Sequence, residues 1–238
     1  MSKIMNGYHF FFKIVKLTNL TLMTGLWASH LMAQPRPITE ASLLDNKPTA
    51  KNQTDGIDYN YLVEITSGFA VGNIRVDGLD GHNAIPINLT LGIPVDDVSL
   101  DDFAGGVFRG NTDFLFKSTN FILDGTQEDR LFGFSFGPRY NFIQPNWPII
   151  PFAEGLVGFG FVNSDPRIDP SGEQFGSGQD FNFLFSVAIG FRYDITDQAF
   201  LRLAAVYTHV SNADLSLPEF ENKALDMIGP ELSLGWKF

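Results

Sequence analysis

The sequence predicts an all-β fold, an eight-stranded antiparallel transmembrane β-barrel. Three observations support this prediction. Apolar and polar residues alternate with period two from Ile57 onward, which is the signature of strands with two different faces. The alternating segments are more than ten residues long, longer than the ~5–6 residues typical of strands in soluble sheets. The apolar face is rich in phenylalanine, with 24 in 238 residues, which suits a surface that faces lipid.

The first 56 residues precede this pattern. Residues 1–33 have the features of a secretory signal: three lysines, an apolar stretch over Leu17–Met32 and a small residue, Ala33. A membrane-anchor helix is the alternative, but the apolar run is interrupted and shorter than the ~20 residues a helical span requires. Residues 34–56 are polar, contain three prolines and are expected to form a flexible periplasmic lead-in. The barrel is expected to occupy residues 57–238.

Eight segments show the alternation. Their expected ranges are 58–73, 84–95, 103–118, 129–143, 148–163, 180–195, 197–211 and 225–238. The sixth illustrates the pattern, with Phe181, Phe183 and Phe185 on one face. Asn182 and Ser186 fall on the other face. Such strands are long enough to cross a bilayer at a tilt, which takes about 9–11 residues.

A sheet in lipid must close into a barrel, because unpaired backbone groups cannot face hydrocarbon. Eight strands is an even number and the lower limit for bacterial barrels, whose interior is then filled with side chains and does not form a pore. The connections near 144–147 and Thr196 are short, and those near 163–179 and 212–225 are long. Short turns belong on the periplasmic side and long loops outside. The turn near 96–102 is longer than this scheme requires.

Aromatic residues near the ends of the expected strands could form girdles at the two membrane interfaces. They are Tyr59, Tyr61, Trp147, Tyr193, Tyr207 and Trp236. The last segment alternates up to a terminal Phe238, like the C-terminal strand by which outer-membrane barrels are recognised for assembly. A soluble β-sandwich or a lipocalin-like barrel is the alternative fold. It is disfavoured because a soluble sheet would present polar residues, and not phenylalanine, on its outer face.

The composition excludes several functions. The chain has no cysteine, so neither a disulfide framework nor a thiolate site is available. Four histidines are too few to favour a multi-histidine metal site, and the acidic loops show no ligand spacing, so neither metal nor cofactor is expected. The net charge of −11 argues against nucleic acid, which requires basic patches.

The seventh segment carries the residues that indicate chemistry. Its outward positions end in His209 and Ser211, which are two residues apart on one face and therefore roughly 6.5–7 Å apart along the strand. A serine hydroxyl becomes a nucleophile when a base lies beside it, and histidine is the usual base. Counting back from Phe238, Asp226 falls on the same outer face of the next strand. A carboxylate behind an imidazole completes the logic of a catalytic triad.

Each residue also has a structural explanation. His209 could be an interfacial polar residue, Ser211-Asn212 is a strand-to-turn signal, and Asp226 could simply begin a strand in the headgroup zone. Five charged residues are expected to point inward and to form a buried network: Glu64, Arg139, Glu154, Arg192 and Arg202. His82 is expected in an outer loop without a partner.

The segment His209-Val-Ser211-Asn212-Ala213, followed by Asn222-Lys-Ala-Leu-Asp226, resembles the lipid A 3-O-deacylase (PagL) family of outer-membrane acyl hydrolases. That family carries His-x-Ser-Asn-Ala and then a stretch resembling Asn-Pro-Gly-x-Glu. The resemblance implies an outer-membrane barrel that removes the 3-O-linked 3-hydroxyacyl chain from lipid A of lipopolysaccharide in the outer leaflet, without a cofactor. By the same resemblance, Ser211 is the nucleophile, His209 the general base and Asp226 the orienting acid. Asn212 and Asn222 would help to hold the oxyanion.

The chain departs from the family pattern at the acid. Lys223-Ala224 stand in place of Pro-Gly, and the acid is Asp where the family has Glu. Glu219 and Glu221 in the preceding loop are therefore alternatives to Asp226, whereas Glu231 is inward by alternation.

Two other functions are alternatives for a barrel of this kind. A non-catalytic barrel with a structural or adhesion role is the main alternative to the esterase. A small-substrate transport barrel is disfavoured by a filled lumen. The sequence leaves open the acyl-chain preference, the oligomeric state, a homodimer included, and whether lipid A is the natural substrate.

Overall fold

The computed structural model describes residues 58–72, 82–124, 128–163, 179–213, 215 and 224–238. The expected signal over 1–33 and the lead-in over 34–56 lie outside the described residues. Within the described ranges, no helix is long and apolar enough to cross a membrane.

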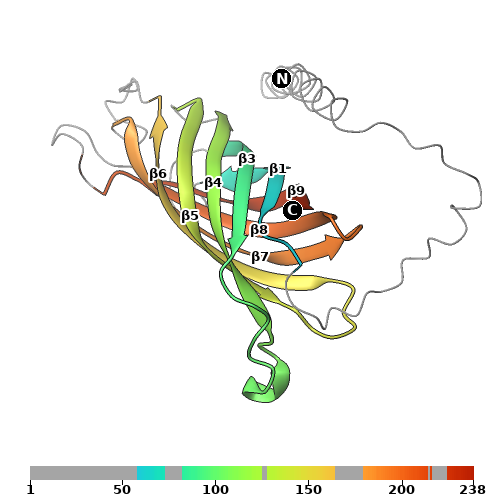
Figure 1. Cartoon of the computed structure of the whole chain (residues 1–238). Helices are drawn as coiled ribbons and strands as arrows, with labels where there is room; N and C mark the ends of the chain where they lie inside the picture. Colours follow the sequence, from blue (N-terminus) through green and yellow to red (C-terminus); the bar gives the residue numbers. More distant parts are fainter. Residues whose placement is uncertain (1–57, 73–81, 125–127, 164–178, 214, 216–223) are drawn as a thin grey trace, which may run out of the picture. The chain divides into compact units, whose positions relative to one another are not determined.

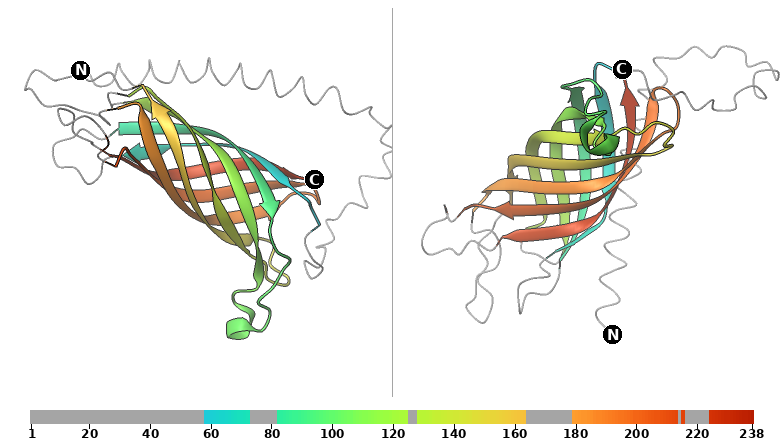
Figure 2. Two further views of the ribbon diagram at one scale, coloured as in Figure 1. Left: turned by 60° about the vertical axis from the view of Figure 1, so that its left-hand side comes forward. Right: turned by 90° about the horizontal axis from the view of Figure 1, so that it is seen from below.

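The described residues form one closed antiparallel β-sheet (Figures 1 and 2). From β3 to β9 each strand pairs with the next, and β1 and β2 both pair with β3 on one side and with β9 on the other, so the sheet has no free edge. The strands are β1 Leu62–Gly68, β2 Ala70–Gly72, β3 His82–Pro94, β4 Gly110–Asp124, β5 Arg130–Phe142, β6 Ile150–Val162, β7 Phe181–Asp194, β8 Ala199–Ser211 and β9 Leu225–Lys237.

β1 and β2 are two parts of a single wall strand. The register against β9 is the same on both sides of the break, because Gly68 pairs with Glu231 and Val71 pairs with Ile228. The break lies opposite Pro230, which has no backbone N–H to donate to the ladder, although Phe69 N still donates to Pro230 O at 3.1 Å. The barrel therefore has eight wall strands, as the alternation predicted.

Seven of the eight expected segments agree with the observed strands to within about four residues at each end. The third was wrong, since the range 103–118 was expected and β4 spans Gly110–Asp124. Residues Phe103–Gly106 form instead a short 3₁₀ helix (η2), in which Ala104 and Gly105 have positive φ angles of 49° and 70°. These left-handed residues end the alternation, although apolar side chains continue through this connection.

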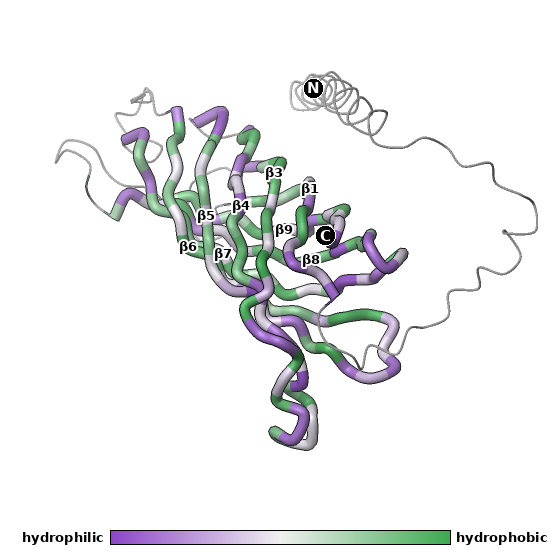
Figure 3. The backbone as a smooth tube through the Cα atoms, in the orientation of Figure 1, coloured by the Kyte–Doolittle hydropathy of each residue, from purple (hydrophilic) through white to green (hydrophobic). Residues whose placement is uncertain are grey.

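The alternation places apolar side chains outward along the whole wall. The tube in Figure 3 shows hydrophobic and hydrophilic residues alternating along the strands. Phe132, Phe159 and Phe183 are each more than 40% exposed. Of the expected girdle residues, Tyr59 was wrongly assigned: it is buried, and its hydroxyl donates to Asp113 Oδ1 at 2.8 Å. The outward apolar surface is the surface that a lipid bilayer stabilises.

The lumen is filled in layers. Beside the start of β8 and the end of β9, Tyr59, Leu62 and Phe200 form an apolar cluster at the end that carries the C-terminus. A second apolar cluster fills the opposite end and includes Leu131, Val210 and Met227. Buried residues of several strands therefore occupy both ends of the barrel.

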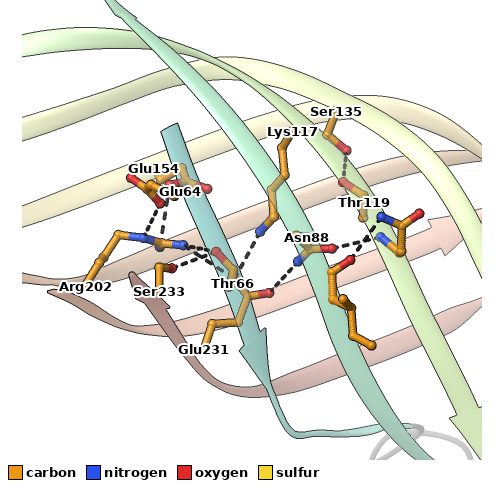
Figure 4. A network of polar contacts seen from close by, with 12 residues as sticks. Glu64, Thr66, Asn88, Lys117, Thr119, Ser135, Glu154, Arg202, Glu231 and Ser233 are labelled. Atoms are coloured by element: carbon orange, nitrogen blue, oxygen red, sulfur yellow. Dashed lines mark hydrogen bonds and ion pairs between the residues drawn. The ribbon is translucent and has the colours of Figure 1, made fainter. Parts of the chain in front are cut away.

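A charged network occupies the middle of the lumen (Figure 4). Arg139 binds Glu64 and also Glu154, with Nε 3.0 Å from Glu154 Oε2. Arg202 Nε donates to Glu64 Oε2 at 2.8 Å, and Lys117 Nζ donates to Glu231 Oε2 at 3.0 Å. The expected inward positions of Glu64, Arg139, Glu154, Arg192 and Arg202 are confirmed, since all five are buried. Buried charges are tolerated when they are paired in this way.

Candidate active site

The candidate site lies where β8 ends and β9 begins. His209 and Ser211 are in the last three residues of β8, and Asp226 is the second residue of β9. This is the end of the barrel that carries the connections 125–129, 163–180 and 212–224. The strand ends at Leu62 and Lys237, near the C-terminus, belong to the opposite end.

The histidine and the carboxylate are direct cross-strand partners. The register pairs His209 with Asp226, and His209 Nδ1 lies 2.9 Å from Asp226 Oδ1. The His209 side chain is 38% exposed and that of Asp226 is 23% exposed. With the carboxylate as acceptor, Nδ1 carries the proton and Nε2 is left as the basic nitrogen. This is the orientation that a general base needs.

Ser211 lies one outward position beyond His209 on the same strand. Its register partner on β7 is Phe183, and the partner of His209 is Phe185. The backbone N–H of Ala213 donates to Ser211 Oγ at 3.2 Å. Ala213 has a φ angle of 55°, so the chain turns sharply just after the serine. Ser211 is thus held at the point where the wall strand becomes a loop.

Tyr207 is an additional contributor to the site. Its hydroxyl hydrogen-bonds to Asp226 Oδ1, the same oxygen that lies against His209 Nδ1. From the sequence, Tyr207 was expected only in an interfacial girdle. Its position two residues before His209 on the same face was the signal that could have linked it to the site.

The surroundings of these polar groups are apolar. Phe183 and Phe185 on β7 are 43% and 45% exposed, and Ile228 on β9 is 45% exposed. A row of rings continues away from the site, with Phe181 and Phe183 centroids 5.3 Å apart and Phe161 and Phe181 centroids 5.6 Å apart. Polar groups of catalytic type therefore open onto a surface suited to hydrocarbon.

The other candidate residues have different positions. Asn212 follows Ser211 directly and is fully buried. Asn222 and the alternative acids Glu219 and Glu221 lie outside the described residues. Glu231 is buried and paired with Lys117, as its inward position predicted. Among the described residues, no cluster of three or more His, Asp or Glu side chains could hold a metal ion.

One histidine was placed wrongly by the sequence. His82 was expected in an outer loop, but it is the first residue of β3 and is only 1% exposed. Its ring lies against Gly72, where a Cβ atom would come within 1.9 Å of Nε2. The absence of a side chain at Gly72 allows the imidazole to pack inside the barrel.

Fold and site together define the class of this protein: a closed eight-stranded antiparallel barrel with an apolar outer face and a Ser, His and Asp constellation at one rim. Residues 106–235 match the family model described as lipid A 3-O-deacylase (PagL). That range is more than half of the chain, and the chain belongs to this family. It is accordingly a β-barrel protein of the bacterial outer membrane. No curated protein gave a significant match.

Several solved outer-membrane proteins are similar to the chain at low sequence identity. The outer-membrane enzyme PagL is 18% identical, with a TM-score of 0.45 over 71% of this chain and 97% of that chain. Neisserial surface protein A is 13% identical, with a TM-score of 0.48 over 77% and 99%. OprG from Pseudomonas aeruginosa is 14% identical, with a TM-score of 0.39 over 76% and 96%.

Proposed function

We propose that this protein is a serine esterase that hydrolyses the 3-O-linked 3-hydroxyacyl chain of lipid A in the outer leaflet, with Ser211, His209 and Asp226 as its triad. The observation that carries the proposal is the 2.9 Å contact between His209 Nδ1 and Asp226 Oδ1, with Ser211 two residues along the same outer face. Membership of the lipid A 3-O-deacylase family supports the choice of substrate.

The first half of the reaction forms an acyl-enzyme. Ser211 Oγ attacks the ester carbonyl carbon while His209 Nε2 accepts the hydroxyl proton. Asp226 stabilises the imidazolium that results and holds the ring in place. As the tetrahedral intermediate collapses, the bond from carbonyl carbon to sugar oxygen breaks and His209 returns the proton to that oxygen. The sugar 3-hydroxyl leaves, and the acyl group remains on Ser211.

The second half regenerates the enzyme. A water molecule attacks the acyl carbonyl, His209 takes one of its protons, and the proton then passes to Ser211 Oγ as the acyl bond breaks. The product is a free 3-hydroxy fatty acid. Asn212, next to the nucleophile, and Asn222 in the adjoining loop are the proposed donors to the oxyanion that develops in both steps.

The position of the site explains how a membrane-bound substrate reaches it. The three side chains belong to the outward face of β8 and β9, beside Phe183 and Phe185. An acyl chain that lies along this apolar face does not have to leave the hydrocarbon layer. Only the ester and the sugar need to reach the rim, where the polar side chains and water are available.

The test is mass spectrometry of lipid A from cells that express the wild type or the Ser211→Ala variant. Ser67→Ala is a matched control, because Ser67 is also a serine on the outer wall, where it is exposed and lies opposite Leu232. We expect one 3-hydroxyacyl mass to be lost with the wild type and the control, and retained with Ser211→Ala. Unchanged lipid A in all three strains, with the barrels folded in the outer membrane, would contradict the proposal and favour a structural or adhesion role.

A further inference from the structure

We infer that Tyr207 is a positioning residue of this site, which acts on catalysis by holding the Asp226 carboxylate against His209. The inference rests on the proposed function, because it assigns a role within the same triad. It goes beyond the triad in naming a fourth side chain that no motif in the sequence indicates.

The register explains why the contact forms. Tyr207 is paired directly with Ile228, and His209 is paired directly with Asp226. Tyr207 and Asp226 are therefore diagonal neighbours on the outer face, a relationship that spans ~7–8 Å between Cα atoms and is within reach of an aromatic side chain. The Tyr207 ring bridges this diagonal, and its hydroxyl meets Asp226 Oδ1.

The direction of the hydrogen bond between Tyr207 and Asp226 follows from the chemistry of the two groups. A carboxylate accepts hydrogen bonds only, so the Tyr207 hydroxyl is the donor. Asp226 Oδ1 thus receives one bond from Tyr207 and faces His209 Nδ1 at 2.9 Å. Two donors to one oxygen limit the rotation of the carboxylate. The short aspartate side chain is held in the orientation that keeps the proton on Nδ1.

The location makes such a support useful. Asp226 is the second residue of β9, at the end of the strand that follows the connection 212–224. Its neighbours on the outer face are apolar, with Ile228 45% exposed. A charged side chain next to an apolar surface is stabilised by donors that replace water. Tyr207 supplies one such donor from within the wall itself.

The first experiment measures kcat and KM for Tyr207→Phe on a detergent-dispersed lipid A substrate. We expect kcat to fall by roughly tenfold, as the loss of a hydrogen bond to a charged group predicts, and KM to change by less than about twofold because Tyr207 is not expected to hold the ground-state substrate. Tyr193→Phe is the matched control, since Tyr193 is an outward tyrosine on β7 near the opposite end of the wall and is 50% exposed. An unchanged kcat in Tyr207→Phe would overturn the inference.

A double-mutant cycle separates positioning from an independent effect. If Tyr207 acts through Asp226, Tyr207→Phe should cause no further loss, within about twofold, in an Asp226→Ala background. An equal tenfold loss in both backgrounds would show that Tyr207 acts elsewhere and would contradict the inference.

A third readout does not need activity. In ¹⁵N-histidine-labelled protein, we expect the His209 ring of the wild type to be protonated mainly on Nδ1, and this share to fall in Tyr207→Phe but not in Tyr193→Phe. The same tautomer population in wild type and Tyr207→Phe would reject the positioning role. A wild type that leaves lipid A intact while its tautomer responds to Tyr207→Phe would instead reject the proposed function alone.

Discussion

His209 and Asp226 face each other across the ladder of β8 and β9, with Nδ1 and Oδ1 2.9 Å apart. Because both residues belong to paired strands, their separation is set by the backbone register and not by a flexible loop. This relationship leads to the first prediction, which concerns the identity of the acid.

Replacement of Asp226 by alanine should lower kcat by roughly 10⁴-fold, because the imidazole loses the group that fixes its tautomer and stabilises its charge. The measurement is the rate of 3-hydroxy fatty acid release by purified barrels in detergent. Glu219→Gln and Glu221→Gln should keep near-wild-type rates. If Asp226→Ala stays active and one of the two glutamate variants loses most of its activity, that glutamate is the acid of the triad.

The activation of Ser211 can be tested by covalent labelling. A fluorophosphonate reacts with serines that have an adjacent base, and we expect it to modify the peptide that contains Ser211. Labelling should disappear in Ser211→Ala and in His209→Asn, while the exposed Ser67 stays unmodified in every variant. A label on Ser67, or labelling of Ser211 that survives His209→Asn, would show that the histidine does not activate the serine.

The oxyanion donors give a third prediction. Removal of one donor from an oxyanion hole typically lowers kcat by about 10²–10³-fold, and this loss is expected for Asn222→Ala. Asn212 is fully buried directly after Ser211, so Asn212→Ala should also lower the stability of the rim. Steady-state kinetics together with thermal unfolding in detergent separates these effects. Full activity in both variants would mean that other groups bind the oxyanion.

The lumen network should control stability and not chemistry. Glu64 is fully buried and binds both Arg139 and Arg202, with Arg202 Nε 2.8 Å from Glu64 Oε2. Glu64→Gln leaves two buried guanidinium groups short of a counter-charge and should reduce the free energy of unfolding by about 3–5 kcal/mol. Urea titration in detergent measures this free energy of unfolding. Asp97→Asn is the control, because Asp97 is exposed and its replacement should leave the stability within about 0.5 kcal/mol of the wild type. Equal stabilities would show that the network contributes nothing.

A polar side chain on the lipid-facing wall should also be structural. The ladder between β3 and β4 is interrupted between the pairs Pro86–Phe121 and Leu89–Ser118. There Asn120 Nδ2 donates to Ile87 O at 3.0 Å, and Asn120 N donates to Asn88 Oδ1 at 2.8 Å. The Asn120 side chain thus replaces a missing wall hydrogen bond.

Asn120→Leu is therefore expected to speed amide exchange in the middle of β3, although leucine is better suited to lipid. The Ile87 carbonyl lies on the lipid-facing wall, where water cannot replace the lost partner. Loss of a partner for a carbonyl shielded from water costs about 1–3 kcal/mol, which corresponds to an acceleration of roughly 5- to 150-fold. Hydrogen exchange of the folded barrel measures the effect. Ile122→Leu, two residues along the same face, should leave the exchange rates as they are in the wild type.

The sequence by itself determined the two faces of each strand, because a strand side chain points to alternate sides whatever its neighbours are. That rule placed Glu64 and Arg139 inside, and Phe132, Phe183 and Phe185 outside. It also put His209 and Ser211 on one outer face, and counting back from Phe238 brought Asp226 to the same face. A local, periodic property was sufficient for these predictions.

The tertiary structure decided the register between strands and the residues at which strands begin and end. The alternation of apolar and polar residues along one strand does not encode either of them. The diagonal bond from Tyr207 to Asp226 depends on which residue of β9 lies opposite His209. The start of β4 at Gly110 depends on left-handed residues in η2, and the burial of His82 depends on the space that Gly72 leaves. Pairing and packing involve residues far apart in the chain, and alternation along one strand carries no information about them.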